Sequence, residues 1–264
     1  MSAPLIGYGD LAIGALLVLL NALLSLLLNL GLGRMLLIAA VRTVLQLLLI
    51  GLLLKTVFAL DSPTLVGAVL LVMFGTASYE ILSRQERRFA GWWGLGAGTA
   101  TTMLATLFVT AFALVALNPS PWYAPQVVIP MVGIVLGSVM NGVAISLNAF
   151  NTGVVRERVA IEARLALGDS KWRALKPLQL GALKSGLIPI INQMSAAGII
   201  TLPGMMTGQI LAGMAPFEAA KYQILILFLL AGGAGLGAFA ATYVAVWRIT
   251  DERDRLRLDR LAAT

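Results

Sequence analysis

The run VVRERVAIEARLALGDSKWRALKP, at residues 154–177, decides the fold of this chain, because it places a charged, helix-forming segment between two long apolar stretches. Charged side chains are rare at membrane depth, so a run of them marks a loop between membrane spans. We therefore expect residues 152–186 to lie in the water phase beside a membrane, where they present a surface to a partner.

The composition predicts an integral membrane protein. Of the 264 residues, 59% are hydrophobic and 12% are charged, whereas roughly 25% are charged in an ordinary soluble domain. Several apolar runs reach about 20 residues, the length that a helix needs to cross the hydrocarbon core of a bilayer. None of them alternates as a strand does, so we expect an all-α, polytopic bundle of membrane helices.

Seven membrane helices are predicted from windows of about 19 residues. They cover Leu5–Leu30, Met35–Leu54, Thr64–Leu82, Trp92–Leu117, Gln126–Phe150, Leu187–Gly213 and Tyr222–Trp247. The first run is too long for the apolar core of a cleavable signal and has no basic segment before it, so we expect it to be retained. The chain is then one transmembrane domain, 1–264, with the segment 152–186 between spans five and six and a tail at 248–264.

The basic residues predict the orientation. If the seven spans alternate in direction, all of the 19 Lys and Arg residues except Arg42, Lys55 and Lys221 fall on one side of the membrane. The positive-inside rule makes that side cytosolic, with the N-terminus outside and the C-terminus inside. The net charge of +7 therefore belongs to cytosolic loops, and we do not expect a nucleic-acid partner.

The residue types exclude most enzyme chemistry. The chain has no cysteine and no histidine, which removes thiolate chemistry, the commonest zinc ligands and the usual proton shuttle near neutral pH. No Gly-x4-Gly-Lys-[Ser/Thr] phosphate loop is present, so ATP would have to bind to another chain. We expect no catalytic residues, although a membrane-embedded enzyme or lipid-handling protein, and a scaffold without transport activity, stay open as alternatives.

The charged run itself predicts two helices joined by a turn. Residues 154–167 form the first, with Arg158 and Glu162 four apart on one face. Gly168 can end this helix in the left-handed conformation that glycine adopts cheaply. We call the resulting helix, turn and helix at residues 154–177 the elbow.

The second helix of the elbow is expected to start at Lys171. Asp169 or Ser170 can supply the side-chain cap for its free backbone N–H groups. Trp172 then lies at the bend, and its large amphipathic ring suits a pocket on a partner.

The string from Glu162 to Gly168 resembles the EAA loop of ABC-transporter permeases, with Arg164 where that loop has a second alanine. In those permeases the loop docks in a groove of a cytosolic ATPase subunit and transmits its motion. The resemblance implies an ATPase-coupling site formed by Glu162, Ala163, Arg164, Gly168, Asp169, Lys171, Trp172 and Arg173.

Longer strings make the chain similar to the FetB-type permease family, which includes a bacterial permease implicated in iron export and plant permeases linked to aluminium tolerance. These strings are RTVLQ at 42–46, IPMVG at 129–133, GV at 142–143, SLN at 146–148 and LPGMMTGQI at 202–210. The resemblance implies a homodimer in the inner (plasma) membrane with two copies of an ABC ATPase subunit. It also implies export of a metal ion or metal-linked compound, with ATP and Mg bound by the partner and no cofactor held by this chain.

Polar residues in the second and third spans form a first candidate group for the translocation path. Arg42 and Gln46 are four apart and share one helix face, and Glu80 is the only acid that we place within a span. A charge at membrane depth faces protein or water. Arg42 therefore either contacts substrate or has a structural role, such as an ion pair with Glu80.

Polar residues in the fifth and sixth spans form a second group. Asn141 and Asn148, seven apart on nearly the same face, combine with Asn192 and Gln193 as candidates to line a polar route. The alternative is hydrogen bonding between helices, worth roughly 0.6 kcal/mol per contact.

A proline and a glycine interrupt the sixth span, and irregular backbone at membrane depth is tolerated where protein or a wet cavity surrounds it. The candidate gate or substrate-contact segment comprises Pro203, Gly204, Met205, Met206 and Gln209. Met131, Met205 and Met206 are weak candidates for metal ligands, because thioether sulfurs suit soft cations such as Cu(I). Methionine is equally a residue that fills gaps in apolar cores.

Overall fold

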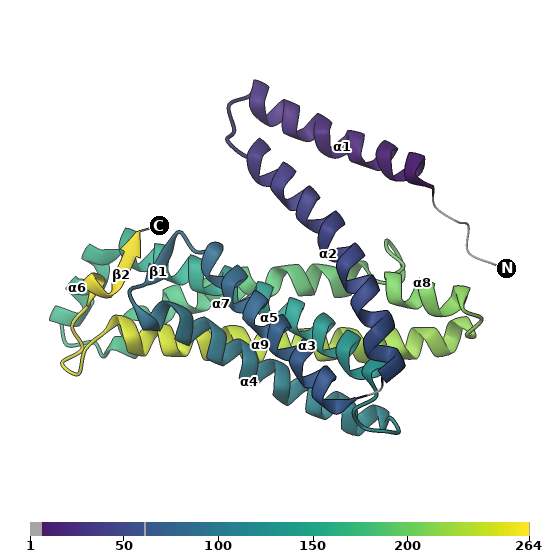
Figure 1. The fold of residues 1–264 in the computed structure, drawn as a ribbon. Coiled ribbons are helices and arrows are strands. Elements are labelled where there is room, and N and C mark those ends of the chain that lie inside the picture. The colour runs from purple at the N-terminus through teal and green to yellow at the C-terminus, as the bar shows by residue number, and fades with distance from the viewer. Residues whose placement is uncertain (1–6, 61, 264) are drawn as a thin grey trace. The chain divides into compact units, whose positions relative to one another are not determined.

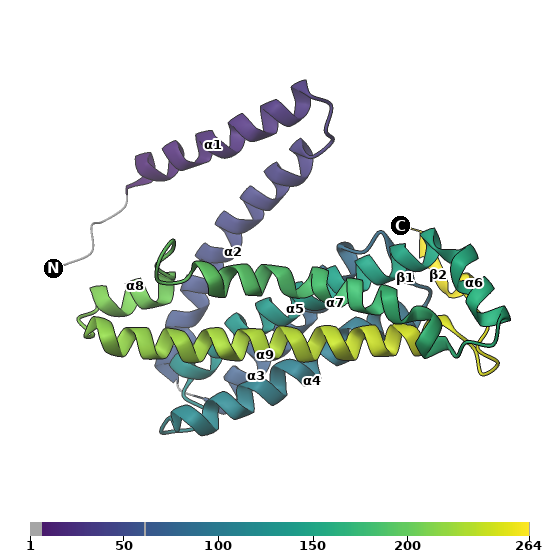
Figure 2. The ribbon, with the colours of Figure 1, turned by 180° about the vertical axis from the view of Figure 1, so that it is seen from behind.

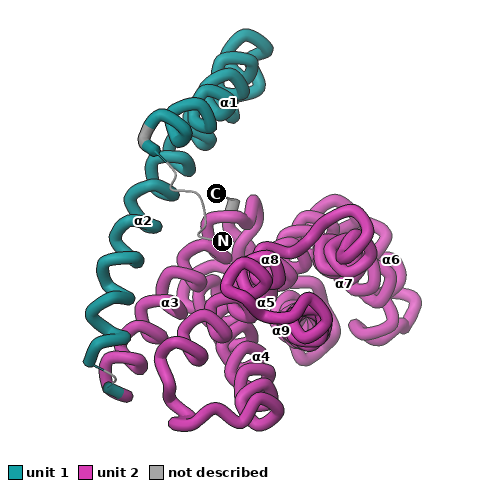
Figure 3. The backbone as a smooth tube through the Cα atoms, turned by 90° about the vertical axis from the view of Figure 1, so that its right-hand side faces the viewer, with its two compact units in different colours: residues 1–62 teal, residues 63–264 magenta. Residues whose placement is uncertain are grey.

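The computed structural model describes residues 7–60 and 62–263, and most of them are helical (Figure 1). The elements are α1 (Tyr8–Leu27), α2 (Gly33–Leu60), α3 (Pro63–Ser83), β1 (Arg87–Phe89), α4 (Trp92–Leu117), α5 (Pro125–Arg156), α6 (Arg158–Ala166), α7 (Lys171–Ala196), α8 (Gly204–Leu211), α9 (Pro216–Ile249), a 3-10 turn (Leu258–Arg260) and β2 (Leu261–Ala263). They form two compact units, residues 1–62 and 63–264, which Figure 3 colours separately.

The predicted fold class, an all-α polytopic membrane bundle, is confirmed. Within residues 7–60 and 62–263, six helices are long and apolar enough to cross a membrane: α1 from Gly9, α2, α3, α4, α5 and α9. Each overlaps one predicted span, and α4 has the predicted bounds. The predicted start of the first span at Leu5 lies outside the described residues.

The predicted sixth span, 187–213, is not one helix. Helix α7, whose first turns belong to the elbow, begins at Lys171, ends at Ala196 and runs beside α9 (Figures 1 and 2). Gly198 then turns the chain with a φ of +83°, and Pro203 is the N-cap of the short helix α8. The break therefore lies before Pro203, and α7 contains Pro177 and Pro189 without ending at either.

The elbow is confirmed as two helices with a glycine turn, but its first helix is shorter than predicted. Residues up to Arg156 belong to α5, a break falls at Glu157, and α6 covers only Arg158–Ala166. Gly168 has the predicted left-handed backbone, with a φ of +95°. Because α5 and α7 run without interruption from the bundle into the elbow, α6 is attached directly to two long helices.

Unit 2 is built around α5, which packs against α3, α4, α7 and α9. Val139, Val143 and Phe150 of α5 are fully buried in its core. Helix α9 approaches closely because it presents glycine, and a Cβ on Gly237 would lie 2.6 Å from Val139 Cγ1. Close packing between helices at small residues is what allows the membrane bundle to be dense.

Unit 1 is a hairpin of α1 and α2. The Ser25 hydroxyl accepts a hydrogen bond from the Leu32 backbone N–H at 3.0 Å, and Asn29 in the connecting turn has a φ of +52°. Gly33 lets the two helices meet, since a Cβ there would lie 3.1 Å from the Ala22 carbonyl oxygen.

The tail, predicted only as a cytosolic extension at 248–264, is folded against the rest of unit 2 over its described residues, 248–263. After α9 ends at Ile249, the chain turns back and β2 pairs antiparallel with β1, with Phe89 opposite Leu261. The elbow, β1 and β2 consequently lie at one end of unit 2, and α8 lies at the other (Figures 1 and 2).

Candidate functional site

The outer surface of the elbow is partly apolar. Val159 and Leu167 are 80% and 89% exposed, whereas Ile161 is 3% exposed and anchors α6 to the core. Arg158 and Glu162 form the predicted pair on the same helix, with Nε and Oε1 2.9 Å apart. Val159 lies on α6 and Leu167 is its C-cap, so the elbow exposes two apolar side chains at the two ends of this helix.

The structure places the predicted coupling residues on two sides of the elbow. Glu162, Ala163, Arg164 and Arg173 are exposed, and Asp169 pairs with Arg173 at 3.7 Å. Ion pairs this exposed contribute little to stability. The charged side chains of the elbow are therefore available to a partner.

Trp172 contacts another helix of its own chain, and its predicted contact with a pocket on a partner stays a prediction. Its ring is half-buried and stacks on Tyr243 of α9, with ring centroids 4.5 Å apart and planes at 21°. The tryptophan thus fixes the start of α7 against α9 of the same chain.

Removing this ring pair should loosen the elbow. A stacked aromatic pair contributes about 0.5–1.5 kcal/mol beyond its buried area. In a double-mutant cycle with Trp172→Ala and Tyr243→Ala, we expect a coupling energy in that range from thermal unfolding. Additive effects of the two substitutions would contradict the stacking contact.

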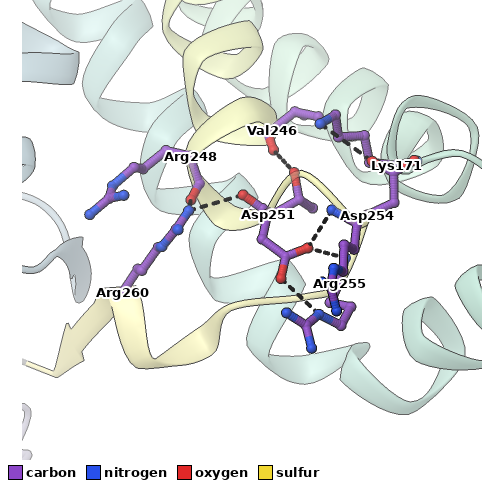
Figure 4. Close-up of polar contacts among 9 residues, drawn as sticks. Lys171, Val246, Arg248, Asp251, Asp254, Arg255 and Arg260 are labelled. Atoms are coloured by element: carbon purple, nitrogen blue, oxygen red, sulfur yellow. Dashed lines mark hydrogen bonds and ion pairs between the residues drawn. The ribbon is translucent and has the colours of Figure 1, made fainter.

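The predicted start of α7 at Lys171 is confirmed, but the predicted side-chain cap from Ser170 is not formed. Ser170 does occupy the N-cap position, but its side chain makes no capping hydrogen bond. The Lys171 backbone N–H instead donates to Asp254 Oδ2 of the tail at 3.2 Å, and Lys171 Nζ lies 3.3 Å from Asp254 Oδ1 (Figure 4). No local pattern in the sequence points to this cap, because 83 residues separate the two partners.

Asp251 organises the turn that carries Asp254. Its Oδ1 accepts hydrogen bonds from the backbone N–H groups of Arg253 and Arg255, each at 2.9 Å, and its Oδ2 accepts one from Arg255 Nε at 2.8 Å. These bonds, above all the one from the Arg255 backbone, hold the pKa of Asp251 below its ordinary value. The carboxylate and the turn therefore persist at neutral pH.

Two cavities lie along the seam between α5 and α7. The elbow cavity has a volume of about 600 Å³, and its polar lining includes Glu86, Asn148, Thr152 and Ser185. The mid-bundle cavity, of about 240 Å³, lies farther from the elbow along α5 and α7, and its polar lining is Ser138, Asn141 and Gln193. Two residues predicted to share a polar route, Asn141 and Gln193, are thus brought together.

The asparagines of α5 also make hydrogen bonds between segments, which was the alternative to the route. Asn141 Oδ1 accepts from Arg84 Nη1 at 2.6 Å, and Asn148 Oδ1 accepts from the Glu86 backbone N–H at 2.9 Å. Both partners come directly after α3, and the sequence did not identify them. Each asparagine therefore both lines a cavity and holds the end of α3.

Helices α5 and α7 touch between the two cavities. A Cβ on Gly186 would lie 2.6 Å from the Gly142 carbonyl oxygen and would collide with the Ser146 hydroxyl. That hydroxyl is fully buried and has no hydrogen-bond partner within the described residues. On α7 the lining of the elbow cavity ends at Ser185 and that of the mid-bundle cavity begins at Gly186, so this crossing lies between the two cavities.

The predicted gate segment lies on α8, at the end of unit 2 opposite the elbow. Met205 packs partly against the core, and Gln209 Oε1 is buried without a hydrogen-bond partner in the described part of the chain. Met131 is 5% exposed and belongs to the apolar core, which is the gap-filling role left open above.

Arg42 and Gln46 lie one turn apart on α2 of unit 1, as predicted. Glu80 of unit 2 forms an ion pair with Arg84, whose Nε is 3.6 Å from Glu80 Oε2. An ion pair of Arg42 with Glu80 would join the two units and stays a prediction.

Relatives of the chain are membrane proteins of similar length. A protein of Synechocystis sp. named UPF0014 membrane protein slr1647 is 38% identical over 238 residues, which is 87% of this chain and 89% of that protein. The Escherichia coli protein named probable iron export permease protein FetB is 29% identical over 96% of this chain and 95% of its own length.

A plant relative, the Arabidopsis thaliana protein ALUMINUM SENSITIVE 3, is 30% identical over 86% of this chain and 81% of its own length. No solved structure matches the chain. The model of the uncharacterised protein family UPF0014 matches residues 8–249, which include every membrane helix described above and the elbow. By this match and by its apolar helices, the chain is a multi-pass membrane protein that belongs to the family UPF0014.

Proposed function

We propose that the chain is the membrane-spanning permease subunit of an ABC transporter that exports a metal ion or a metal-linked compound and is driven by a separate ATPase subunit. One observation carries this proposal. Helices α5 and α7 line both cavities, and the same two helices continue into the elbow at Arg156 and Lys171. A force applied to α6 from outside the membrane therefore acts directly on the cavity walls.

In the proposed mechanism, two copies of the chain pair in the inner membrane and each elbow docks against one ATPase subunit. ATP and Mg bind to the ATPase subunits, whose closure displaces α6. The displacement separates α5 from α7 at Gly142 and Gly186, so that the elbow cavity and the mid-bundle cavity join. Such a device needs two discrete packings of the α5–α7 crossing, one closed and one open.

The elbow end of unit 2 is proposed to face the cytosol. Besides the basic residues of the elbow and tail, this end carries Trp93 and Trp247, whose ring centroids lie 5.6 Å apart. The Arg248 guanidinium lies 5.0 Å from the centroid of the Trp93 ring. Tryptophan is enriched at membrane–water interfaces and basic residues on the cytosolic side, which supports this orientation.

The nature of the cargo follows from the cavity lining and from the names of the relatives. The name of the Escherichia coli relative refers to iron export and that of the Arabidopsis relative to aluminium. Hard cations prefer oxygen ligands. The Ser138 hydroxyl and the Gln193 amide provide such oxygens, so we favour a hard metal ion or an oxygen-rich metal complex.

Co-purification and transport test this function. The tagged chain, purified from native membranes, is expected to carry an ATPase in equal copies, and sealed vesicles that contain both should transport iron or aluminium complexes only with ATP. Turnover of a lipid without nucleotide would instead support an enzyme. A partner without phosphate loops would support a scaffold.

A substitution of Gln193 distinguishes a polar route for the substrate from a purely structural contact between helices. The side chain of Gln193 is exposed, lines the mid-bundle cavity and makes no hydrogen bond to another described residue. Gln193→Leu should therefore leave the melting temperature unchanged while it lowers transport about tenfold, the effect of one lost substrate hydrogen bond. Asn192→Leu, next to it on α7 and outside the cavity lining, is the control, and equal transport by both variants would contradict the route.

A further inference from the structure

We propose that the C-terminal tail, residues 250–263, is a component of the coupling joint, and that Asp254 is a positioning residue that holds the first turn of α7 in place for the docking partner. This inference rests on the proposed function, because it adds a second segment to the same coupling site. It is carried by four sets of contacts within unit 2.

The tail is attached to the end of α9. The last carbonyl groups of a helix have no partner inside the helix. Arg260 Nη1 donates to the carbonyl oxygens of Arg248, at 2.7 Å, and Thr250, at 2.9 Å (Figure 4). A side chain ten residues downstream thus caps α9 and fixes the path of the segment between.

Within that segment the turn at Asp251 aims Asp254 at the elbow. The hydrogen bonds from Arg253 and Arg255 to the Asp251 carboxylate close the turn. Asp254 itself has a left-handed backbone, with a φ of +54°, a conformation that asparagine and aspartate tolerate better than most residues. An uncommon backbone geometry held by three side-chain bonds indicates a defined position rather than a loose end.

Both carboxylate oxygens of Asp254 contact Lys171, the first residue of α7. One oxygen accepts the backbone N–H at 3.2 Å and the other lies 3.3 Å from Nζ. A carboxylate at a helix N-terminus satisfies a free N–H group and is favoured by the helix dipole. Since Ser170 makes no cap of its own, the tail supplies the cap that the elbow lacks.

The far end of the tail reaches a third helix. Strand β2 pairs with β1, and the Ala90 backbone N–H donates to the Arg260 carbonyl oxygen at 2.8 Å, directly before α4 begins at Trp92. The tail therefore ties the start of α4, the start of α7 and the end of α9. A displacement of the elbow would reach α4 and α9 through the tail as well as α5 and α7 directly.

Three substitutions at Asp254 distinguish the loss of the cap from strain in the left-handed backbone at this position. Asp254→Ala removes both contacts with Lys171. Asp254→Gly also removes them, but it adopts a positive φ without strain. Asp254→Asn keeps an oxygen for the Lys171 N–H and tolerates the left-handed backbone. Asp259→Ala, which breaks an exposed tail pair with Arg257 at 2.8 Å, is the matched control.

Amide hydrogen exchange, measured on the chain reconstituted in lipid, tests the contact between Asp254 and Lys171 in the absence of the ATPase. We expect the amides of residues 171–175 to exchange about five-fold faster in the Ala and Gly variants, the change that loss of a typical N-cap produces. The Asn and Asp259→Ala variants should exchange at the wild-type rate. Unchanged exchange in the Ala and Gly variants would refute the cap.

Coupling is measured as the ratio of ATP molecules hydrolysed to substrate molecules transported. The measurement uses vesicles that hold the chain with its co-purified ATPase. The ratio should rise about five-fold in the Ala and Gly variants and stay constant in Asp254→Asn and in the control. Faster exchange with a constant ratio would overturn the coupling role and leave only a structural one. A wild-type chain without any ATPase would overturn the proposed function itself, and the two failures are distinguishable because the exchange measurement needs no partner.

Discussion

Leu167→Asp is expected to abolish association with the ATPase while the chain stays folded. The leucine is 89% exposed at the end of α6, so the substitution removes almost no contact within the chain. A charge introduced into an apolar interface has to be desolvated without a partner, and central apolar anchors contribute about 2 kcal/mol or more, roughly thirty-fold in affinity. The measurement is the amount of ATPase that co-purifies with each variant.

Leu167→Met is the matched control, because methionine keeps an apolar side chain of similar volume and should retain the ATPase. The melting temperatures of both variants should equal that of the wild type. If Leu167→Asp kept a full complement of ATPase, the exposed apolar face of the elbow would not be the docking surface.

Gly186→Ala is expected to give the largest effect inside the membrane. Its Cβ would lie 2.6 Å from a backbone carbonyl oxygen on α5, and backbone does not yield as the end of a flexible side chain does. Overpacking of this kind costs about 2 kcal/mol, or roughly 5 °C in melting temperature for a chain of this size. Transport should fall to background, because the closed packing of α5 on α7 can no longer form.

The control for this substitution is Gly232→Ala on α9, where a Cβ would meet nothing within 4 Å and which lines neither cavity. Alanine there should leave transport unchanged and is favourable within a helix. Equal stability and transport in the two variants would rule out the crossing at Gly186 as the barrier between the cavities.

Most of the helices of this protein were predictable because few backbone structures can cross a bilayer. Apolar runs of sufficient length form helices, since every backbone N–H and C=O group must find a partner inside the segment. The bounds of α4 were therefore predicted, as was the left-handed turn at Gly168. Both follow from interactions among residues close together in the sequence.

The wrong prediction of a single span at residues 187–213 arose from interactions between residues that are distant in the sequence. The capping pattern predicted a helix start at Lys171, but a window over apolar residues could not join the polar first turns of α7 to the rest of that helix. Those turns are stabilised from outside the segment. Trp172 stacks on Tyr243 and Asp254 caps Lys171. Neither partner is near in sequence, so no periodicity within the segment records them.

The candidate site likewise combines residues that the sequence predicted with contacts that it did not predict. The elbow and the polar residues Asn141, Asn148 and Gln193 were identified from residue type and spacing. Their partners were not, because Arg84 and Glu86 approach α5 only when α3 packs beside it. The role of Gly186 depends likewise on the point at which two helices cross.

The amino-acid sequence by itself determined that the chain crosses a membrane as helices and carries a charged elbow, since hydrophobic length, charge position and glycine turns act locally. Only the tertiary structure decided which helices enclose the cavities, which glycine lies between them and that the tail caps α7. Those features arise from packing and hydrogen bonds between distant segments, whose energies depend on where the backbone of each helix lies relative to its neighbours.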